Sequence, residues 1–88
     1  MVPEATAAAG KRLDLSVVAP LYNESQNVGP LVEWILEALG SYPGAFEVIL
    51  VDDGSRDDTW ERVVAASAAD VRVRGLALGR NVRVGDAG

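Results

Sequence analysis

The sequence predicts a small α/β domain: a Rossmann-like βαβαβ half of a doubly wound parallel sheet. Short β-branched or apolar runs of strand length alternate with longer stretches in which apolar residues recur at helical spacing. Parallel strands need crossover connections of about this length, and such crossovers are right-handed almost without exception. The length of 88 residues allows one small domain.

Three segments are expected to be strands. Residues 46–51 form a nearly continuous apolar run that ends in two aspartates, which suits a strand buried on both faces of a parallel sheet. Residues 13–19 are β-branched and apolar and stop at Pro20. Residues 71–78 alternate at first and continue past a glycine, and we interpret them as the third strand.

Two helical patterns lie between the strands. The first repeats apolar residues at i, i+3, i+4 and i+7, namely Leu31, Trp34, Ile35 and Ala38. Pro30 suits the first turn of this helix, and Gly40 suits its exit. The second pattern has the same spacing at Trp60, Val63, Val64 and Ser67. Asp58 or Thr59 is expected to cap its start, and both tryptophans are expected to be core residues.

Composition excludes several classes of function. The chain has no cysteine and no histidine, so acid–base chemistry falls to carboxylates and any metal site to oxygen ligands. The net charge of −5 argues against nucleic-acid binding. No apolar run approaches the roughly 18 residues that span a bilayer, and residues 1–12 lack the apolar core of a signal peptide. We therefore expect residues 1–12 to be a disordered tail and the chain to be cytoplasmic.

The predicted topology brings three unusual segments together. Folds of this kind bind ligands beyond the carboxyl ends of their parallel strands. Residues 20–25, 52–57 and 79–85 all follow a predicted strand, so they are expected at one edge of the sheet.

The acidic segment 52–59 allows two interpretations. A carboxylate at a strand end can accept hydrogen bonds from a ribose hydroxyl or a base N–H, and Gly54 permits a sharp turn. The same residues can instead satisfy free backbone N–H groups before the helix. Both hold if Asp53 is functional while Asp57 and Asp58 are structural.

The segment after the first predicted strand also allows two interpretations. Tyr22 and Glu24 could stack on a base and hydrogen-bond to it, or the loop could simply turn at Asn23. No glycine lies between Pro20 and Val28, so the Gly-x-Gly-x-x-Gly turn of a dinucleotide site is missing. Arg80, after the third strand, could contact a diphosphate or occupy a solvated turn.

Residues 17–24 and 51–59, together with Arg80-Asn81, closely resemble family-2 glycosyltransferases. The dolichol-phosphate mannose synthase-like and polyprenyl-phosphate sugar transferase branch is nearest. The resemblance covers residues 13 to about 81, which is only the opening part of the family's catalytic domain. It implies a GT-A fold, truncated in this chain, that binds a nucleotide-diphospho-sugar such as a UDP- or GDP-sugar.

The resemblance also implies roles for individual residues. Pro20, Tyr22 and Glu24 would lie against the base and ribose of the nucleotide. Asp53 would accept a hydrogen bond from the base or ribose, with Asp52 supporting it.

Other parts of the family's machinery are not matched. The metal-binding Asp-x-Asp and the carboxylate base come later in the family, so we expect Mg²⁺ or Mn²⁺ only in the complete enzyme and no catalytic residue in this chain. The chain would be the donor-nucleotide half of a sugar transferase, inactive alone, and the acceptor in the full-length enzyme could be a polyprenyl phosphate at the inner face of the membrane. An uncovered third strand would favour self-association.

Two alternatives stay open from the residues alone. The first is a non-catalytic remnant or interaction module of the same fold. The second, less favoured, is a receiver-like domain, which needs a lysine beyond a later strand, whereas the sole lysine here is Lys11.

Overall fold

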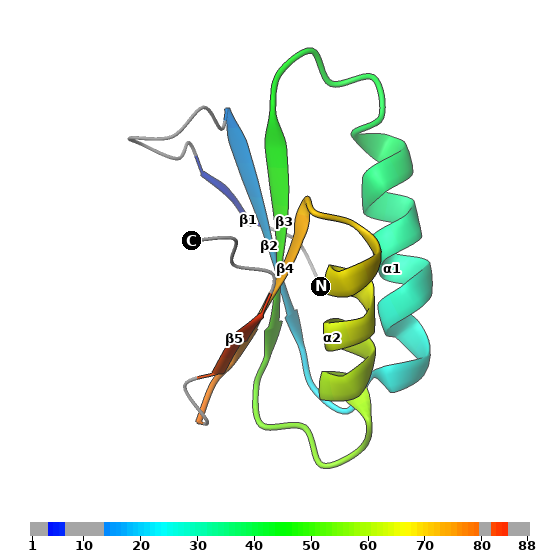
Figure 1. The fold of residues 1–88 in the computed structure, drawn as a ribbon, viewed down its shortest axis with the longest axis vertical. Helices are drawn as coiled ribbons and strands as arrows, with labels where there is room; N and C mark the ends of the chain where they lie inside the picture. The colour runs from blue at the N-terminus through cyan, green and yellow to red at the C-terminus, as the bar shows by residue number, and fades with distance from the viewer. Residues whose placement is uncertain (1–3, 7–13, 80–81, 85–88) are drawn as a thin grey trace.

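The computed structural model describes residues 4–6, 14–79 and 82–84. A five-stranded sheet in the order β1-β2-β3-β4-β5 carries two helices on one of its faces (Figure 1). The elements, in chain order, are β1 Glu4–Thr6, β2 Leu15–Leu21, α1 Ser25–Ala38, β3 Phe46–Asp52, α2 Thr59–Ala69, β4 Val73–Ala77 and β5 Val82–Val84.

The centre of the sheet is parallel, as predicted. β2 pairs with β3 and β3 with β4, with Leu21 opposite Asp52 and Asp52 opposite Ala77. The strand–helix–strand–helix–strand order of the prediction is confirmed over β2 to β4. Each crossover steps to the next neighbour in the same direction, so α1 and α2 lie side by side on one face (Figure 1).

Short antiparallel strands cover both sides of the parallel centre. β1 pairs with β2, and β5 pairs with β4 from Gly75 to Ala77. The third parallel strand was expected to leave its edge open, and the structure corrects this, because β5 occupies that edge. Glu4–Thr6, expected within a disordered tail, form a strand. The other residues of segment 1–12 lie outside the described part of the chain.

The hydrophobic core lies between the helices and the helix-facing side of the sheet. Its fully or nearly fully buried residues alternate along the strands and recur along the helices. They are Val17, Ala19, Leu21, Val28, Val32, Ile35, Phe46, Val48, Leu50, Val63 and Val73. Burial of one such aliphatic side chain contributes roughly 1.5–3 kcal/mol, so this single layer holds the helices on the sheet.

The first helix differs from its prediction. It begins at Ser25, so Pro30 lies inside it rather than in its first turn. Its buried residues are Val28, Val32 and Ile35, spaced i, i+4 and i+7. Trp34, expected in the core, is 63% exposed, because a residue next to Ile35 lies about 100° around the helix. By contrast, Trp60 in α2 does pack against the core.

The face of the sheet opposite the helices carries a polar cluster. The Ser16 hydroxyl donates to Glu47 Oε2 at 2.5 Å, and Arg74 Nε lies 3.5 Å from Glu47 Oε1. Ser16 and Glu47 are both buried. A buried carboxylate needs such partners, since its charge is costly to remove from water. This cluster lies towards the amino ends of the strands, away from the edge described next.

Candidate functional site

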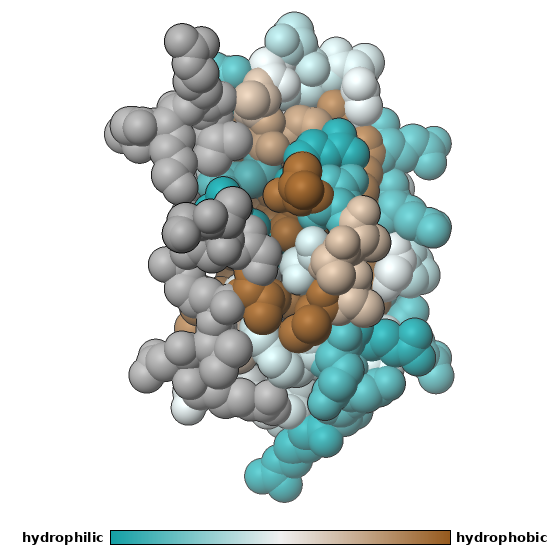
Figure 2. Space-filling view, in the orientation of Figure 1, coloured by the Kyte–Doolittle hydropathy of each residue, from teal (hydrophilic) through white to brown (hydrophobic). Residues whose placement is uncertain are grey.

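The carboxyl ends of the three parallel strands meet at one edge, as the sequence predicts. Asp53 N donates to Leu21 O at 2.9 Å, and Leu78 N donates to Asp52 O at 2.9 Å. These bonds continue the sheet one residue past each strand end. Hydrophilic residues gather at this lower end of the molecule, where the chain leaves β3 (Figure 2).

The two adjacent aspartates have different environments. Asp52 is fully buried, and its Oδ1 accepts from Ser55 N at 3.0 Å. Its Oδ2 is also buried and has no hydrogen-bond partner among the described residues. Gly54 follows with φ +74°, a conformation that favours glycine. Asp52 therefore shapes the turn, while Asp53 is exposed at the edge.

The residues after β2 form the other side of this edge. Pro20 is exposed and lies opposite Val51 in the register. It is tolerated inside β2 because β1 pairs only as far as Val18, so no further ladder partner is lost there. Tyr22 is 54% exposed, and Glu24 Oε1 accepts from Tyr22 N at 3.3 Å.

Strand alternation indicates which face these side chains share. Leu21 and Asp52 are buried on the helix side. Their successors, Tyr22 and Asp53, are therefore expected to leave the strands towards the helix-free face, where Pro20 also lies. The structure thus brings Pro20, Tyr22, Glu24 and Asp53 to one edge, with Asp52 buried beneath it. Arg80, predicted to contact a diphosphate, lies outside the described residues.

The loops after β2 and β3 are joined by hydrogen bonds that the sequence did not indicate. The backbone amide of Arg56 donates to Asn23 Oδ1 at 2.8 Å. Three consecutive backbone N–H groups of the loop after β2 donate to side chains of the segment after β3. Asn23 N donates to Ser55 Oγ at 2.8 Å, and Glu24 N donates to Thr59 Oγ1 at 2.9 Å. Ser25 N donates to Asp57 Oδ2 at 3.4 Å. Sequence reasoning missed them because their partners lie more than 30 residues apart.

The cap of α2 also differs from its prediction. Asp58 makes no side-chain bond to the helix start. Instead, Asp57 Oδ1 accepts from Thr59 N at 2.9 Å and from the Thr59 hydroxyl. The Thr59 hydroxyl, helped by the Thr59 and Ser25 amides, lowers the pKa of Asp57 below its ordinary value. The Ser25 hydroxyl and then Arg62 lower the pKa of Asp58. Asp57 thus satisfies backbone N–H groups at this helix start, as one interpretation proposed, whereas Asp58 has the Ser25 hydroxyl and Arg62 as partners.

Comparison with known proteins identifies the family. The profile of glycosyl transferase family 2 matches residues 16–87, which include both helices, β3, β4 and all but the first residue of β2. The chain belongs to this family. Its α/β architecture is that of a Rossmann-like part of a GT-A fold.

Several family-2 relatives are similar over part of their length. A dodecaprenyl-phosphate galacturonate synthase of Rhizobium johnstonii is 60% identical over 47 residues, which are 53% of this chain and 14% of that protein. An undecaprenyl-phosphate 4-deoxy-4-formamido-L-arabinose transferase of Salmonella choleraesuis is 40% identical over 68 residues, 76% of this chain and 21% of that protein. An uncharacterized glycosyltransferase of Synechocystis is 33% identical over 69 residues, 78% of this chain and 22% of that protein.

The chain therefore spans between about a seventh and a fifth of these relatives. Neither helix within residues 4–6, 14–79 and 82–84 is long and apolar enough to cross a membrane.

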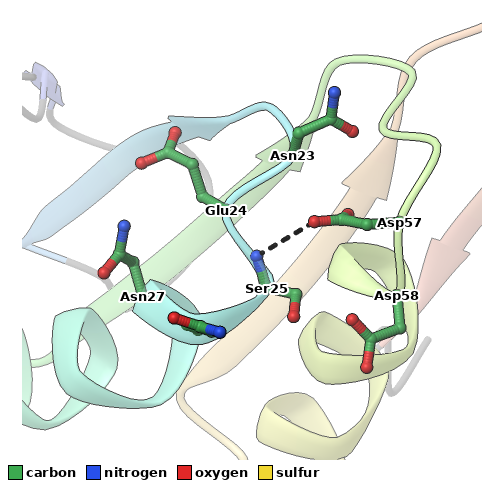
Figure 3. Close-up of a pocket in the computed structure, with 7 residues that line it drawn as sticks. Asn23, Glu24, Ser25, Asn27, Asp57 and Asp58 are labelled. Carbon is green, nitrogen blue, oxygen red and sulfur yellow. Dashed lines mark hydrogen bonds between the residues drawn. The ribbon is translucent and has the colours of Figure 1, made fainter.

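An open cavity of about 280 Å³ adjoins the edge (Figure 3). Asp57 points at the backbone of Ser25 across it, whereas the Glu24 carboxylate points away from Asp57. Tyr22 and Asp53 do not line this cavity, so it is a neighbour of the predicted nucleotide site and not the same surface. Its lining residues are Asn23, Glu24, Ser25, Gln26, Asn27, Asp57 and Asp58.

The acids around this cavity do not fit the divalent cation that the family resemblance implies. Asp57 is occupied by backbone and hydroxyl donors, and Asp58 Oδ2 lies 3.4 Å from Arg62 Nε. Glu24 points elsewhere. Across the described ranges, no three potential acidic, histidine or cysteine ligands come together. We therefore derive no chemical step through a metal from these residues.

Proposed function

We propose that this chain supplies the donor-nucleotide site of a glycosyltransferase that moves a sugar from a nucleotide-diphospho-sugar to a polyprenyl phosphate. One observation carries the proposal. In a chain of glycosyl transferase family 2, an exposed aromatic residue and two acidic residues lie in the neighbouring loops directly beyond the carboxyl ends of two paired parallel strands. They are Tyr22, Glu24 and Asp53, and this is where α/β sheets bind ligands.

Each residue has a chemical task in this proposal. The ring of Tyr22 offers a stacking surface for a nucleobase, which is favourable because both partners have flat apolar faces. The exposed Asp53 carboxylate accepts a hydrogen bond from a base N–H or a ribose hydroxyl, and charged acceptors make the stronger bonds. Pro20 packs against the base or ribose, and Glu24 accepts a further hydrogen bond. Asp52 supports Asp53 by fixing the turn.

The acceptor part of the proposal rests on the relatives. Two of them are named for transfer to, or synthesis on, dodecaprenyl or undecaprenyl phosphate. We propose the same acceptor class for the protein to which this site contributes. The donor is a uridine or guanosine diphosphate sugar.

Nucleotide titration followed by NMR tests the donor site. UDP and GDP are titrated into the chain while the amides of Tyr22 and Asp53 are observed. A few hydrogen bonds and one stacking surface, set against the lost freedom of the ligand, predict a dissociation constant on the order of 1 mM. Asp53→Ala should weaken binding, and the matched variant Asp58→Ala should not.

Two results would overturn the proposal. The first is that neither diphosphate shifts these amides at about 10 mM in a folded sample, roughly ten times the expected dissociation constant. The second is that Asp58→Ala abolishes binding while Asp53→Ala preserves it.

A further inference from the structure

Asn23 forms a bridge between the two loops of the edge, with the Ser55 hydroxyl and the Arg56 amide as its partners. Asn23 gives its backbone N–H to Ser55 Oγ at 2.8 Å, and its side-chain Oδ1 receives the N–H of Arg56 at 2.8 Å. One residue therefore binds the second loop through both its backbone and its side chain. Asn23 and Ser55 stand 32 positions apart in the sequence.

The backbone of Asn23 makes this bridge specific to a few residue types. Its φ of +48° lies in the left-handed region, which asparagine and glycine adopt more readily than other residues. Glycine would keep the conformation but remove the Oδ1 acceptor. Asparagine provides both features.

The bridge begins where the sheet ends. The last backbone hydrogen bonds that continue the strand pairing are donated by Asp53 N to Leu21 O and by Leu78 N to Asp52 O. Beyond them, the described hydrogen bonds between the two loops use side chains, and Ser55 itself is buried and held by Asp52. The sheet therefore sets where the loops start, whereas the bridge ties together the loop segments that carry Tyr22 and Asp53.

We propose that Asn23 and Ser55 are positioning residues that hold Tyr22 and Asp53 in the geometry that binds the nucleotide before the nucleotide arrives. The proposal rests on the proposed function of this edge. Asn23 lies between Tyr22 and Glu24, and Ser55 lies two residues after Asp53. Neither residue needs to touch the ligand.

The expected effect follows from conformational populations. If the loops keep the binding geometry only part of the time, the apparent dissociation constant rises in inverse proportion to that fraction. Loss of one bond of the bridge is expected to reduce the fraction to roughly a third to a tenth, because one hydrogen bond contributes modestly and the bonds of Glu24 to Thr59 and of Ser25 to Asp57 still join the loops. The nucleotide should then bind about threefold to tenfold more weakly.

The test compares variants of the full 88-residue chain in the UDP and GDP titration. Asn23→Gly keeps the left-handed backbone and removes the acceptor, and Ser55→Ala removes the hydroxyl. Asn23→Asp keeps an acceptor and should restore binding. Asp14→Ala is the matched control, because Asp14 Oδ2 accepts from Ala45 N at 2.9 Å in an equivalent loop contact at the opposite end of the sheet.

The proposal expects Asn23→Gly and Ser55→Ala to raise the dissociation constant about threefold to tenfold, measured on folded protein. Asn23→Asp and Asp14→Ala should stay within about twofold of the unchanged chain. The double variant should bind no better than the worse single one, because Asn23→Gly removes the bond from the Arg56 N–H and Ser55→Ala removes the bond from the Asn23 N–H. Should Asn23→Gly not fold, Ser55→Ala gives the same comparison.

The titrations distinguish a failure of the positioning role from a failure of the proposed donor-nucleotide site. If the unchanged chain binds and the two bridge variants bind equally well, only the positioning role is overturned. It is also overturned if Asp14→Ala weakens binding as much as they do, because the effect is then general destabilisation. If the unchanged chain binds neither diphosphate, the proposed function fails, and the positioning role fails with it.

Discussion

Replacement of Gly75 by alanine should destabilise the fold, because β4 and α2 touch at this residue. A Cβ built at Gly75 would lie 2.4 Å from Val63 Cγ1 and 2.8 Å from Val84 Cγ2. Carbon atoms in contact normally stay 3.5–4.0 Å apart. Val63 is fully buried, so it cannot move aside into solvent.

Two opposing terms set the magnitude. An extra carbon forced into a packed core typically costs about 1–3 kcal/mol. Alanine in place of a strand glycine recovers about 0.5–1 kcal/mol, because the unfolded chain loses less entropy on folding. The difference spans about 0–2.5 kcal/mol, and the 2.4 Å contact with Val63 places the expected net loss in its upper half, at about 1–2.5 kcal/mol in the free energy of unfolding. For a chain of this size, that lowers the melting temperature by roughly 5–20 °C.

The assay is thermal and urea unfolding followed by circular dichroism. Gly29→Ala is the matched control, since a Cβ at that helical glycine meets nothing within 4 Å. It should raise stability by about 0.5–1 kcal/mol, which is the helix preference of alanine over glycine. The two glycine-to-alanine changes should thus have opposite signs.

A double variant identifies the cause. Val63→Ala should cost less in the Gly75→Ala background than alone, because the new methyl group fills the space that the valine leaves. The packing argument is refuted if Gly75→Ala is as stable as the unchanged chain. It is also refuted if the costs of Gly75→Ala and Val63→Ala simply add.

Three further predictions concern polar and exposed groups. Glu47→Ala should lower the free energy of unfolding by about 2–3 kcal/mol, as measured by urea unfolding. This loss is smaller than that expected when a fully buried ion pair is broken, because Arg74 is partly exposed. A loss under about 1 kcal/mol would contradict the prediction. Trp34→Ser should change stability by less than about 0.5 kcal/mol, as for other surface substitutions, and a loss above 2 kcal/mol would indicate a core residue. Because the Thr59 hydroxyl lowers the pKa of folded Asp57, this carboxylate stabilises the fold above its unfolded pKa, and that contribution is lost as the pH falls below about 4. Urea midpoints between pH 6 and pH 3 should therefore fall less in Asp57→Asn than in the unchanged chain, and parallel curves would count against this assignment.

The order of the elements could be predicted from the sequence because its signals are local. The apolar run at 46–51 and the spacing of apolar residues in each helical segment depend on neighbouring residues alone. The positions of the loops followed from topology, since parallel strands end at a common edge. The family resemblance depended on the same loops, and the match to glycosyl transferase family 2 confirms it.

Local sequence patterns could not predict which residues are buried where two sets of residues fitted the same helical spacing. The stripe of Leu31, Trp34 and Ile35 competes with that of Val28, Val32 and Ile35, and only the docking of the helix selects between them. Trp34 is exposed for this reason. The short strands β1 and β5 also depend on partners elsewhere in the chain, since three residues carry too little pattern to be recognised.

The sequence by itself therefore determined the fold class, the family and the edge of the sheet at which the loops of Tyr22, Glu24 and Asp53 lie. The tertiary structure alone decided how that edge is built. Burial separated Asp52, which shapes the turn, from the exposed Asp53. The bridge between Asn23 and Ser55 became visible only once β2 and β3 were paired, because a hydrogen bond between residues 32 positions apart leaves no periodic trace in the chain.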